Sequence, residues 1–190
     1  MSPNAFGQLT EEERRLRDFA NDAIRQHKPK QFVISGIEHD DPTAQRLLEL
    51  LQAEYVGLFG QVDPDPSADL HTARQPDGDI LLLFPNELGS GAQGIVAWTR
   101  MDETTAVMHR MYVHFNHRGN GYSKILLAAL ESSARQAGIT RMLLETDPVM
   151  VAANALYRGA RYTEVEPFGF YGENPQEWTN SVFLGKDIAQ

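Results

Sequence analysis

The chain has 190 residues, of which 42% are hydrophobic and 23% charged, and its formal net charge is −9. This composition suits one folded domain with a hydrophobic core. The absence of cysteine excludes disulfides, thiolate metal sites and a cysteine nucleophile. The acidic charge argues against a nucleic-acid partner. No histidine pair has the spacing of a metal site, and no segment is typical of a membrane span or signal peptide, so we expect no metal, no membrane partner and a cytoplasmic location.

Hydrophobic periodicity and the positions of glycine and proline predict the following elements. In chain order, they are a helix over 10–27, a strand over 31–37, a helix over 41–58, a loop over 61–79, strands over 80–84, 94–100 and 107–115, a helix over 122–137, a strand over 141–145, a short helix over 151–159 and strands over 162–166 and 179–186. The predicted fold is α+β, with a mixed, mostly antiparallel twisted sheet flanked by helices. Residues 1–30 are expected to be a helical extension of a single domain over 31–190.

A glycine-rich turn, residues 118–124 (RGNGYSK), joins the strand over 107–115 to the helix that follows. Backbone N–H groups at such a turn, together with the helix dipole, form a cradle for phosphate oxygens. The dinucleotide-binding pattern would need glycine at Lys124, and the P-loop pattern is absent. A tight turn with no ligand is the alternative. The surrounding segment 107–161 carries seven basic and three acidic residues, which favours a small polyanion or reflects a chance cluster.

The turn resembles the acyl-CoA signature of the GNAT acetyltransferases, Q/R-x-x-G-x-G/A. The segments that resemble the family's neighbouring elements are 109–113 (HRMYV), 125–131 (ILLAALE), 143–146 (LLET), 155–162 (ALYRGARY) and 166–171 (EPFGFY). The resemblance covers residues 94–186 and implies the GNAT-like acyl-CoA N-acyltransferase fold. It also implies that the strands over 107–115 and 141–146 splay apart to admit the pantetheine arm.

The resemblance implies acetyl-CoA as the acyl donor. In the family the turn binds the pyrophosphate and the preceding strand lies along pantetheine. The residues that this assigns to the cofactor are Met111, Tyr112, Val113, Arg118, Gly119, Asn120, Gly121, Tyr122, Ser123, Lys124 and Asn154.

The resemblance also assigns Tyr157 as the general acid that protonates the leaving thiolate. Its alternative role is packing in the core. Many relatives have a glutamate general base where this chain has Val107, so His109, on the same strand face, is the candidate substitute. A structural role is the alternative for His109. Met150 stands where relatives often have asparagine or glutamine.

The residues that the resemblance assigns to the acceptor are Glu54, Tyr55, Phe168 and Tyr171. The expected acceptor is a primary amine of a small molecule, amino acid or peptide. A catalytically weak acyl-CoA-binding sensor or regulatory module is the alternative function, favoured by Val107 and Met150. A homodimer is left open.

Overall fold

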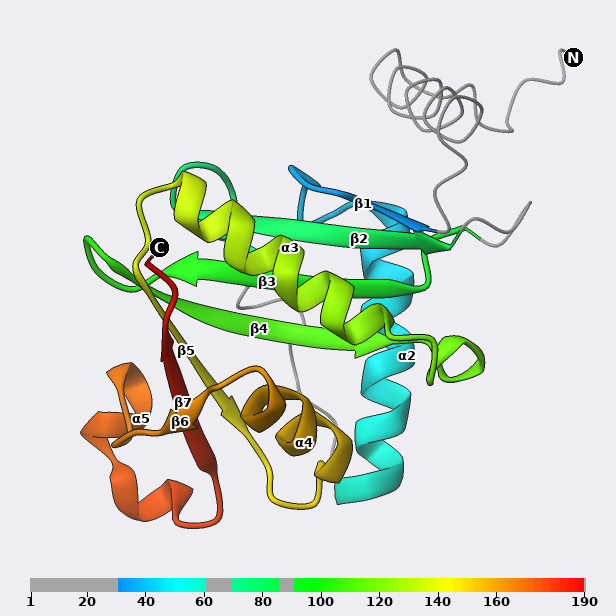
Figure 1. The fold of residues 1–190 in the computed structure, drawn as a ribbon. Helices are drawn as coiled ribbons and strands as arrows, with labels where there is room; N and C mark the ends of the chain where they lie inside the picture. The colour runs from blue at the N-terminus through cyan, green and yellow to red at the C-terminus, as the bar shows by residue number, and fades with distance from the viewer. Residues whose placement is uncertain (1–30, 61–69, 86–90, 190) are drawn as a thin grey trace, which may run out of the picture.

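The computed structural model describes residues 31–60, 70–85 and 91–189, and the helix expected over 10–27 lies outside them. The strands form one sheet in the order β1-β2-β3-β4-β5-β7-β6 (Figure 1). The strands are β1 (Gln31–Ile34), β2 (Gly78–Pro85), β3 (Gly94–Arg100), β4 (Thr105–Val113), β5 (Arg141–Thr146), β6 (Thr163–Glu164) and β7 (Val182–Asp187). The helices are α2 (Pro42–Phe59), α3 (Tyr122–Gln136), α4 (Val151–Gly159) and α5 (Gly169–Glu173), with 3-10 turns η2 (Phe115–His117) and η3 (Pro175–Trp178).

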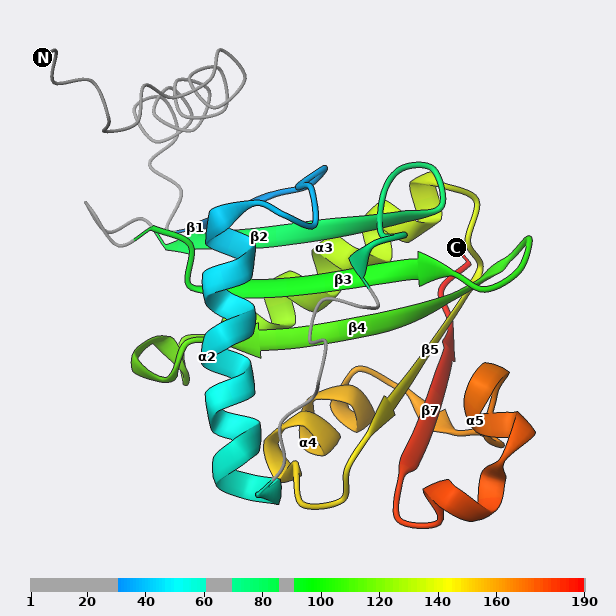
Figure 2. The ribbon, with the colours of Figure 1, turned by 180° about the vertical axis from the view of Figure 1, so that it is seen from behind.

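The sheet carries helices on both faces. Helix α3 crosses β2, β3 and β4 on one face, and α2 crosses them on the other (Figures 1 and 2). Strand β2 shows why its sequence is continuously apolar: Leu81 and Leu83 pack on the α3 side, while Ile80 and Leu82 pack on the α2 side. Because side chains alternate along a strand, a strand covered on both faces buries consecutive residues.

The sheet splits between β4 and β5. These two strands are parallel, and their pairing covers Thr105↔Arg141, Ala106↔Met142 and Val107↔Leu143. Strand β4 continues to Val113 while β5 diverges from it (Figure 1). The splay predicted from the sequence is therefore confirmed. The other strand pairs among the described residues are antiparallel, so the mixed, mostly antiparallel sheet is also confirmed.

A β-bulge interrupts β4 beside the split. Ala97 pairs with His109 and Ile95 with Tyr112, so two β4 residues face one residue of β3. Arg110, inside the bulge, has φ 54°. This is a left-handed backbone conformation that residues other than glycine rarely adopt. Bulges re-aim the side chains that follow them. Accordingly, Met111 packs on the α3 side and Tyr112 on the α2 side.

The C-terminal third differs from the expected elements. Residues 169–178, for which no element was predicted, form α5 and η3, and β7 begins at Val182 rather than 179. The strand expected over 162–166 contributes only Thr163–Glu164 to the sheet. Aromatic contacts hold this segment in place of strand pairing. Their members are Phe168, Phe170, Tyr171, Trp178 and Phe183.

Candidate active site

Two adjoining cavities lie at the split in the sheet. The first, of about 500 Å³, is bounded by α2, β4, β5, α4 and η3, and it is called here the acceptor cavity. Its lining residues are Tyr55, Phe59, Met108, His109, Arg110, Met111, Leu144, Glu145, Thr146, Asp147, Met150, Ala153, Tyr157, Trp178 and Ser181. The second, of about 460 Å³, adjoins the glycine turn and is called here the coenzyme cavity. Met111, Met150 and Ala153 line both.

The glycine turn supplies an open cradle. Gly119 and Gly121 have φ 80° and 79°, a region that glycine enters without steric cost. Gly121 is the N-cap of α3, and no side chain of the described residues caps that helix. The first backbone N–H groups of a helix have no partner within it. A Cβ at either glycine would meet no protein atom within 4 Å, so the space above the turn is open to a phosphate.

Arg118, at the start of the turn, is fixed by three groups. Its Nη2 lies 2.6 Å from Glu54 Oε2, and its Nε donates to the Val113 carbonyl at 2.9 Å. Its guanidinium also lies over the Tyr112 ring, 5.6 Å from the centroid. The Tyr112 hydroxyl donates to Glu54 Oε1 at 3.1 Å. Burial, followed by the charge of Glu54, raises the pKa of Tyr112 to about 12.

The sequence-predicted cofactor residues mostly meet at the coenzyme cavity. Those that line it are Met111, Tyr112, Val113, Arg118, Gly119, Gly121, Tyr122 and Ser123. Asn120, Lys124 and Asn154 are not among its lining residues. The amide of Asn120 donates to the His117 carbonyl, and that of Asn154 to the Asp147 and Met150 carbonyls. These two amides therefore brace loops instead of facing the cavity.

Tyr157 lies on α4 and lines the acceptor cavity with only 5% of its surface exposed. Its ring packs against Tyr162. Burial, and after it the neighbouring Tyr55, raises the pKa of Tyr157 above its ordinary value. The phenol is therefore protonated at neutral pH, which is the form that a general acid requires.

His109 also lines the acceptor cavity. Its Nε2 lies 2.8 Å from the Thr99 hydroxyl oxygen on the neighbouring strand. The ring is thus positioned by β3, with one nitrogen engaged in that hydrogen bond.

Glu145 is a site residue that the sequence analysis did not assign. It lies on β5, beside the split, and lines the acceptor cavity. Burial raises the pKa of its carboxyl group, Asp147 raises it further, and a hydrogen bond with Ser181 opposes them. A carboxylate with a raised pKa in a cavity is a candidate acid or base. The sequence signal that could have identified Glu145 is its position as a charged residue directly after the apolar run Met142–Leu144.

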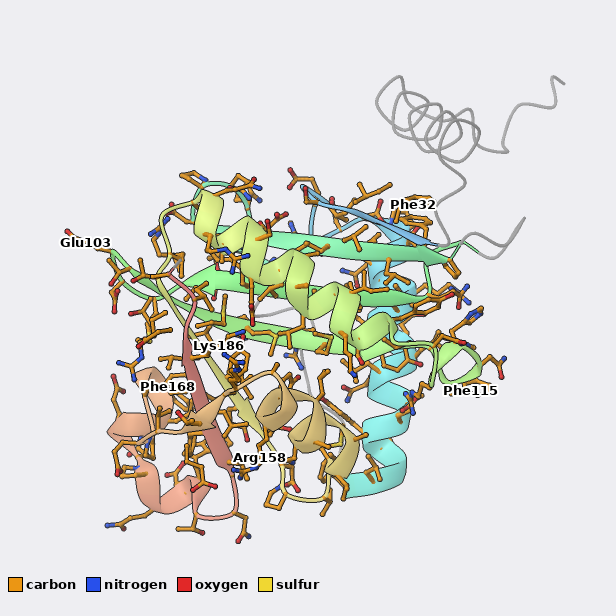
Figure 3. All side chains as sticks on the ribbon, viewed as in Figure 1. Phe32, Glu103, Phe115, Arg158, Phe168 and Lys186 are labelled. Carbon is orange, nitrogen blue, oxygen red and sulfur yellow. The ribbon has the colours of Figure 1, made fainter. Side chains whose placement is uncertain are left out.

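The four predicted acceptor residues do not meet in one place. Tyr55 lines the acceptor cavity, whereas Glu54 lines the coenzyme cavity. Phe168 and Tyr171 line neither and pack against Phe183. Phe168 lies on the opposite side of the molecule from Phe115, which neighbours the glycine turn (Figure 3). From this segment, Trp178, in contact with Tyr171, contributes aromatic surface to the acceptor cavity instead.

Among the described residues, no group of three or more histidines and carboxylates could hold a metal ion. None of the helices described is both long and apolar enough to cross a bilayer.

Comparisons with known proteins agree with this geometry. Residues 44–160 match the model of the acetyltransferase (GNAT) family. Over 154 residues the chain is 28% identical to an IAA acetyltransferase of Azospirillum brasilense, covering 80% of this chain and 97% of the relative. It is 25% identical to the uncharacterized N-acetyltransferase YsnE of Bacillus subtilis, covering 80% and 99%. The chain therefore belongs to the GNAT family, as the sequence predicted.

Solved structures show the same fold. A Klebsiella pneumoniae protein assigned as an acyl-CoA N-acyltransferase superposes with a TM-score of 0.68 at 27% identity, covering 84% of this chain and 98% of that one. The PaiA N-acetyltransferase of Thermoplasma acidophilum, solved in complex with coenzyme A, gives a TM-score of 0.64 at 14% identity, covering 84% and 99%. Family membership implies acyl transfer from an acyl-CoA.

Proposed function

We propose that this protein transfers the acetyl group of acetyl-CoA directly to a primary amine of a small molecule, amino acid or peptide. The observation that carries the proposal is the position of Tyr157, a buried protonated phenol in the acceptor cavity, which adjoins the coenzyme cavity. Eight of the predicted cofactor residues line the coenzyme cavity, which supports acetyl-CoA as the acyl donor. The lack of cysteine favours direct transfer over a cysteinyl intermediate.

The reaction needs a neutral amine, a polarised thioester carbonyl and a proton for the departing thiolate. The amine nitrogen attacks the carbonyl carbon, the C–N bond forms and the C–S bond breaks. Tyr157 gives its proton to the sulfur. His109 and Glu145 both line the cavity, and either can receive the proton that the amine loses.

The alternative function, an acyl-CoA sensor or regulatory module, rests on Val107 in place of the glutamate base and on Met150 in place of asparagine or glutamine. A panel of primary amines separates the two functions when free thiol release from acetyl-CoA is followed. Amine-dependent release supports the enzyme. Acetyl-CoA binding by calorimetry without amine-dependent release from any member would support the sensor.

A further inference from the structure

The acceptor cavity carries charges of both signs. Glu145 and Asp147 contribute carboxylates from β5 and the loop after it, and Arg110 contributes a guanidinium from β4. Burial raises the pKa of the Glu145 carboxyl, and the neighbouring negative charge of Asp147 raises it further, so the two carboxylates create a negative potential at this end of the cavity. The negative end of the cavity therefore retains an electrostatic preference for a cationic group.

Arg110 stands at the bulge beside the split. The bulge aims successive residues of β4 toward the cavity, and all four residues from Met108 to Met111 line it. A half-buried guanidinium is matched in geometry to a carboxylate, which it can bind through two parallel hydrogen bonds. A ligand carrying only positive charge would meet repulsion here.

An aromatic surface completes the cavity. Tyr55 and Phe59 pack edge to face on α2, with centroids 5.7 Å apart, and Trp178 lies on η3. The buried Trp178 Nε1 has no hydrogen-bond acceptor among the described residues. A carboxylate oxygen of a ligand would satisfy this donor, since buried N–H groups are rarely left without a partner.

We propose that the acceptor is an α-amino acid with an aromatic or other large apolar side chain. Glu145 holds its ammonium group, Arg110 holds its carboxylate, and Tyr55, Phe59 and Trp178 surround its side chain. This inference rests on the proposed function, because it names the acceptor of that same site.

With this acceptor, a destination can be given for each proton that moves in the reaction. The ammonium group of the amino acid passes one proton to the Glu145 carboxylate, and the neutral nitrogen attacks the thioester carbonyl. The C–N bond forms, the C–S bond breaks, and the thiolate takes the proton of Tyr157. The second nitrogen proton leaves to solvent as the amide forms, and the tyrosine is reprotonated from solvent.

Three acceptors with the same aromatic ring test the proposal: L-phenylalanine, L-phenylalaninamide and 2-phenylethylamine. The variant is Arg110→Asn, because asparagine tolerates positive φ and so preserves the bulge. The control is Arg161→Asn, since Arg161 also has positive φ, at 69°, but is exposed and outside the cavity. Acetyl-CoA affinity, measured by calorimetry, checks that each variant keeps its coenzyme cavity.

We expect kcat/KM for L-phenylalanine to fall in Arg110→Asn about 10- to 100-fold more than that for 2-phenylethylamine, as expected for a lost charged hydrogen bond. For each amine, kcat/KM of the variant is divided by that of the wild type, so that the different basicities of the three amines do not affect the comparison. Arg161→Asn should change the three values equally. Equal losses for all three amines in Arg110→Asn overturn the proposal, as does a wild-type protein that acetylates 2-phenylethylamine but not L-phenylalanine. In that second case the proposed function stands. Acetyl-CoA binding with no acetylation of any amine overturns both.

Discussion

Glu54 and Arg118 form an ion pair between α2 and the glycine turn, although 64 residues separate them in the chain. The pair places the Glu54 carboxylate beside the coenzyme cavity, which suits phosphates. The carboxylate neutralises the Arg118 guanidinium and accepts a hydrogen bond from the Tyr112 hydroxyl. Helix α2 thereby positions the turn from the opposite face of the sheet.

Glu54→Gln should lower the pKa of Tyr112 from about 12 without returning it to the ordinary value of 10. Burial is the larger cause of the raised pKa, and it persists when the charge of Glu54 is removed. The measurement is an ultraviolet titration of tyrosinate, with Tyr112→Phe identifying the signal. A Tyr112 pKa unchanged by the substitution would show that the two side chains are not in contact in solution.

Gly121→Val should abolish acetyl-CoA binding while the protein remains folded. The valine side chain would fill the open space above the turn, and a left-handed residue other than glycine costs roughly 1–2 kcal/mol. Gly138→Val is the matched control, since Gly138 has φ 84°, meets no atom within 4 Å and lies outside the coenzyme cavity. Both variants should lose similar stability by thermal unfolding, but only Gly121→Val should lose the calorimetric signal. Full affinity in Gly121→Val would assign the turn a purely structural role.

Tyr157→Phe should lower kcat by roughly 10²- to 10⁴-fold, the usual contribution of a general acid. The neighbouring Tyr162 offers the comparison, because its hydroxyl donates to Glu131 and it does not line the cavity. Tyr162→Phe should instead reduce stability by about 1 kcal/mol and spare kcat. Turnover in Tyr157→Phe equal to that of the wild type would place Tyr157 in the core alone.

Glu145→Gln should make the protein more stable at neutral pH and no more stable in acid. A folded-state pKa raised above the unfolded value, here near 4.5, means that the protonated carboxyl is tolerated at low pH. As pH rises through the folded pKa, the buried charge destabilises the fold. Glutamine removes this pH-dependent loss. Thermal unfolding over a pH series measures it, and the exposed Glu103→Gln (Figure 3) should show no such gain. A gain that is equal at every pH would contradict the raised pKa.

The glycine turn could be predicted because it depends on local sequence, whereas the split between β4 and β5 was predicted from the resemblance to the GNAT family. The φ values of Gly119 and Gly121 require glycine, and the following helix shows a regular apolar period. The predicted acid, Tyr157, lies in the acceptor cavity, which adjoins the coenzyme cavity. Its catalytic role stays a prediction.

Other parts of the site depend on contacts that no local pattern encodes. The bulge places an arginine, not a glycine, at positive φ. Helix α5 contains Gly169 and Gly172, which have low helix propensity, and aromatic packing holds it. The resemblance assigned Glu54 to the acceptor, and its pairing with Arg118, 64 residues away, is a contact that no local pattern predicts. Glu145 carried no motif, and its raised pKa follows from burial that only the folded sheet creates.

The divergence of β4 from β5 also gives this sheet an edge in its interior. Exposed strand edges are sites where other chains can add and start aggregation, and proteins protect them. Here the edge opens into a cavity bounded by α2 and α4, so access to it is limited by the width between two helices. Helices that cover an unpaired strand edge keep other chains from pairing with it. The same opening that can receive a coenzyme arm therefore protects the protein against growth of its sheet by a second polypeptide.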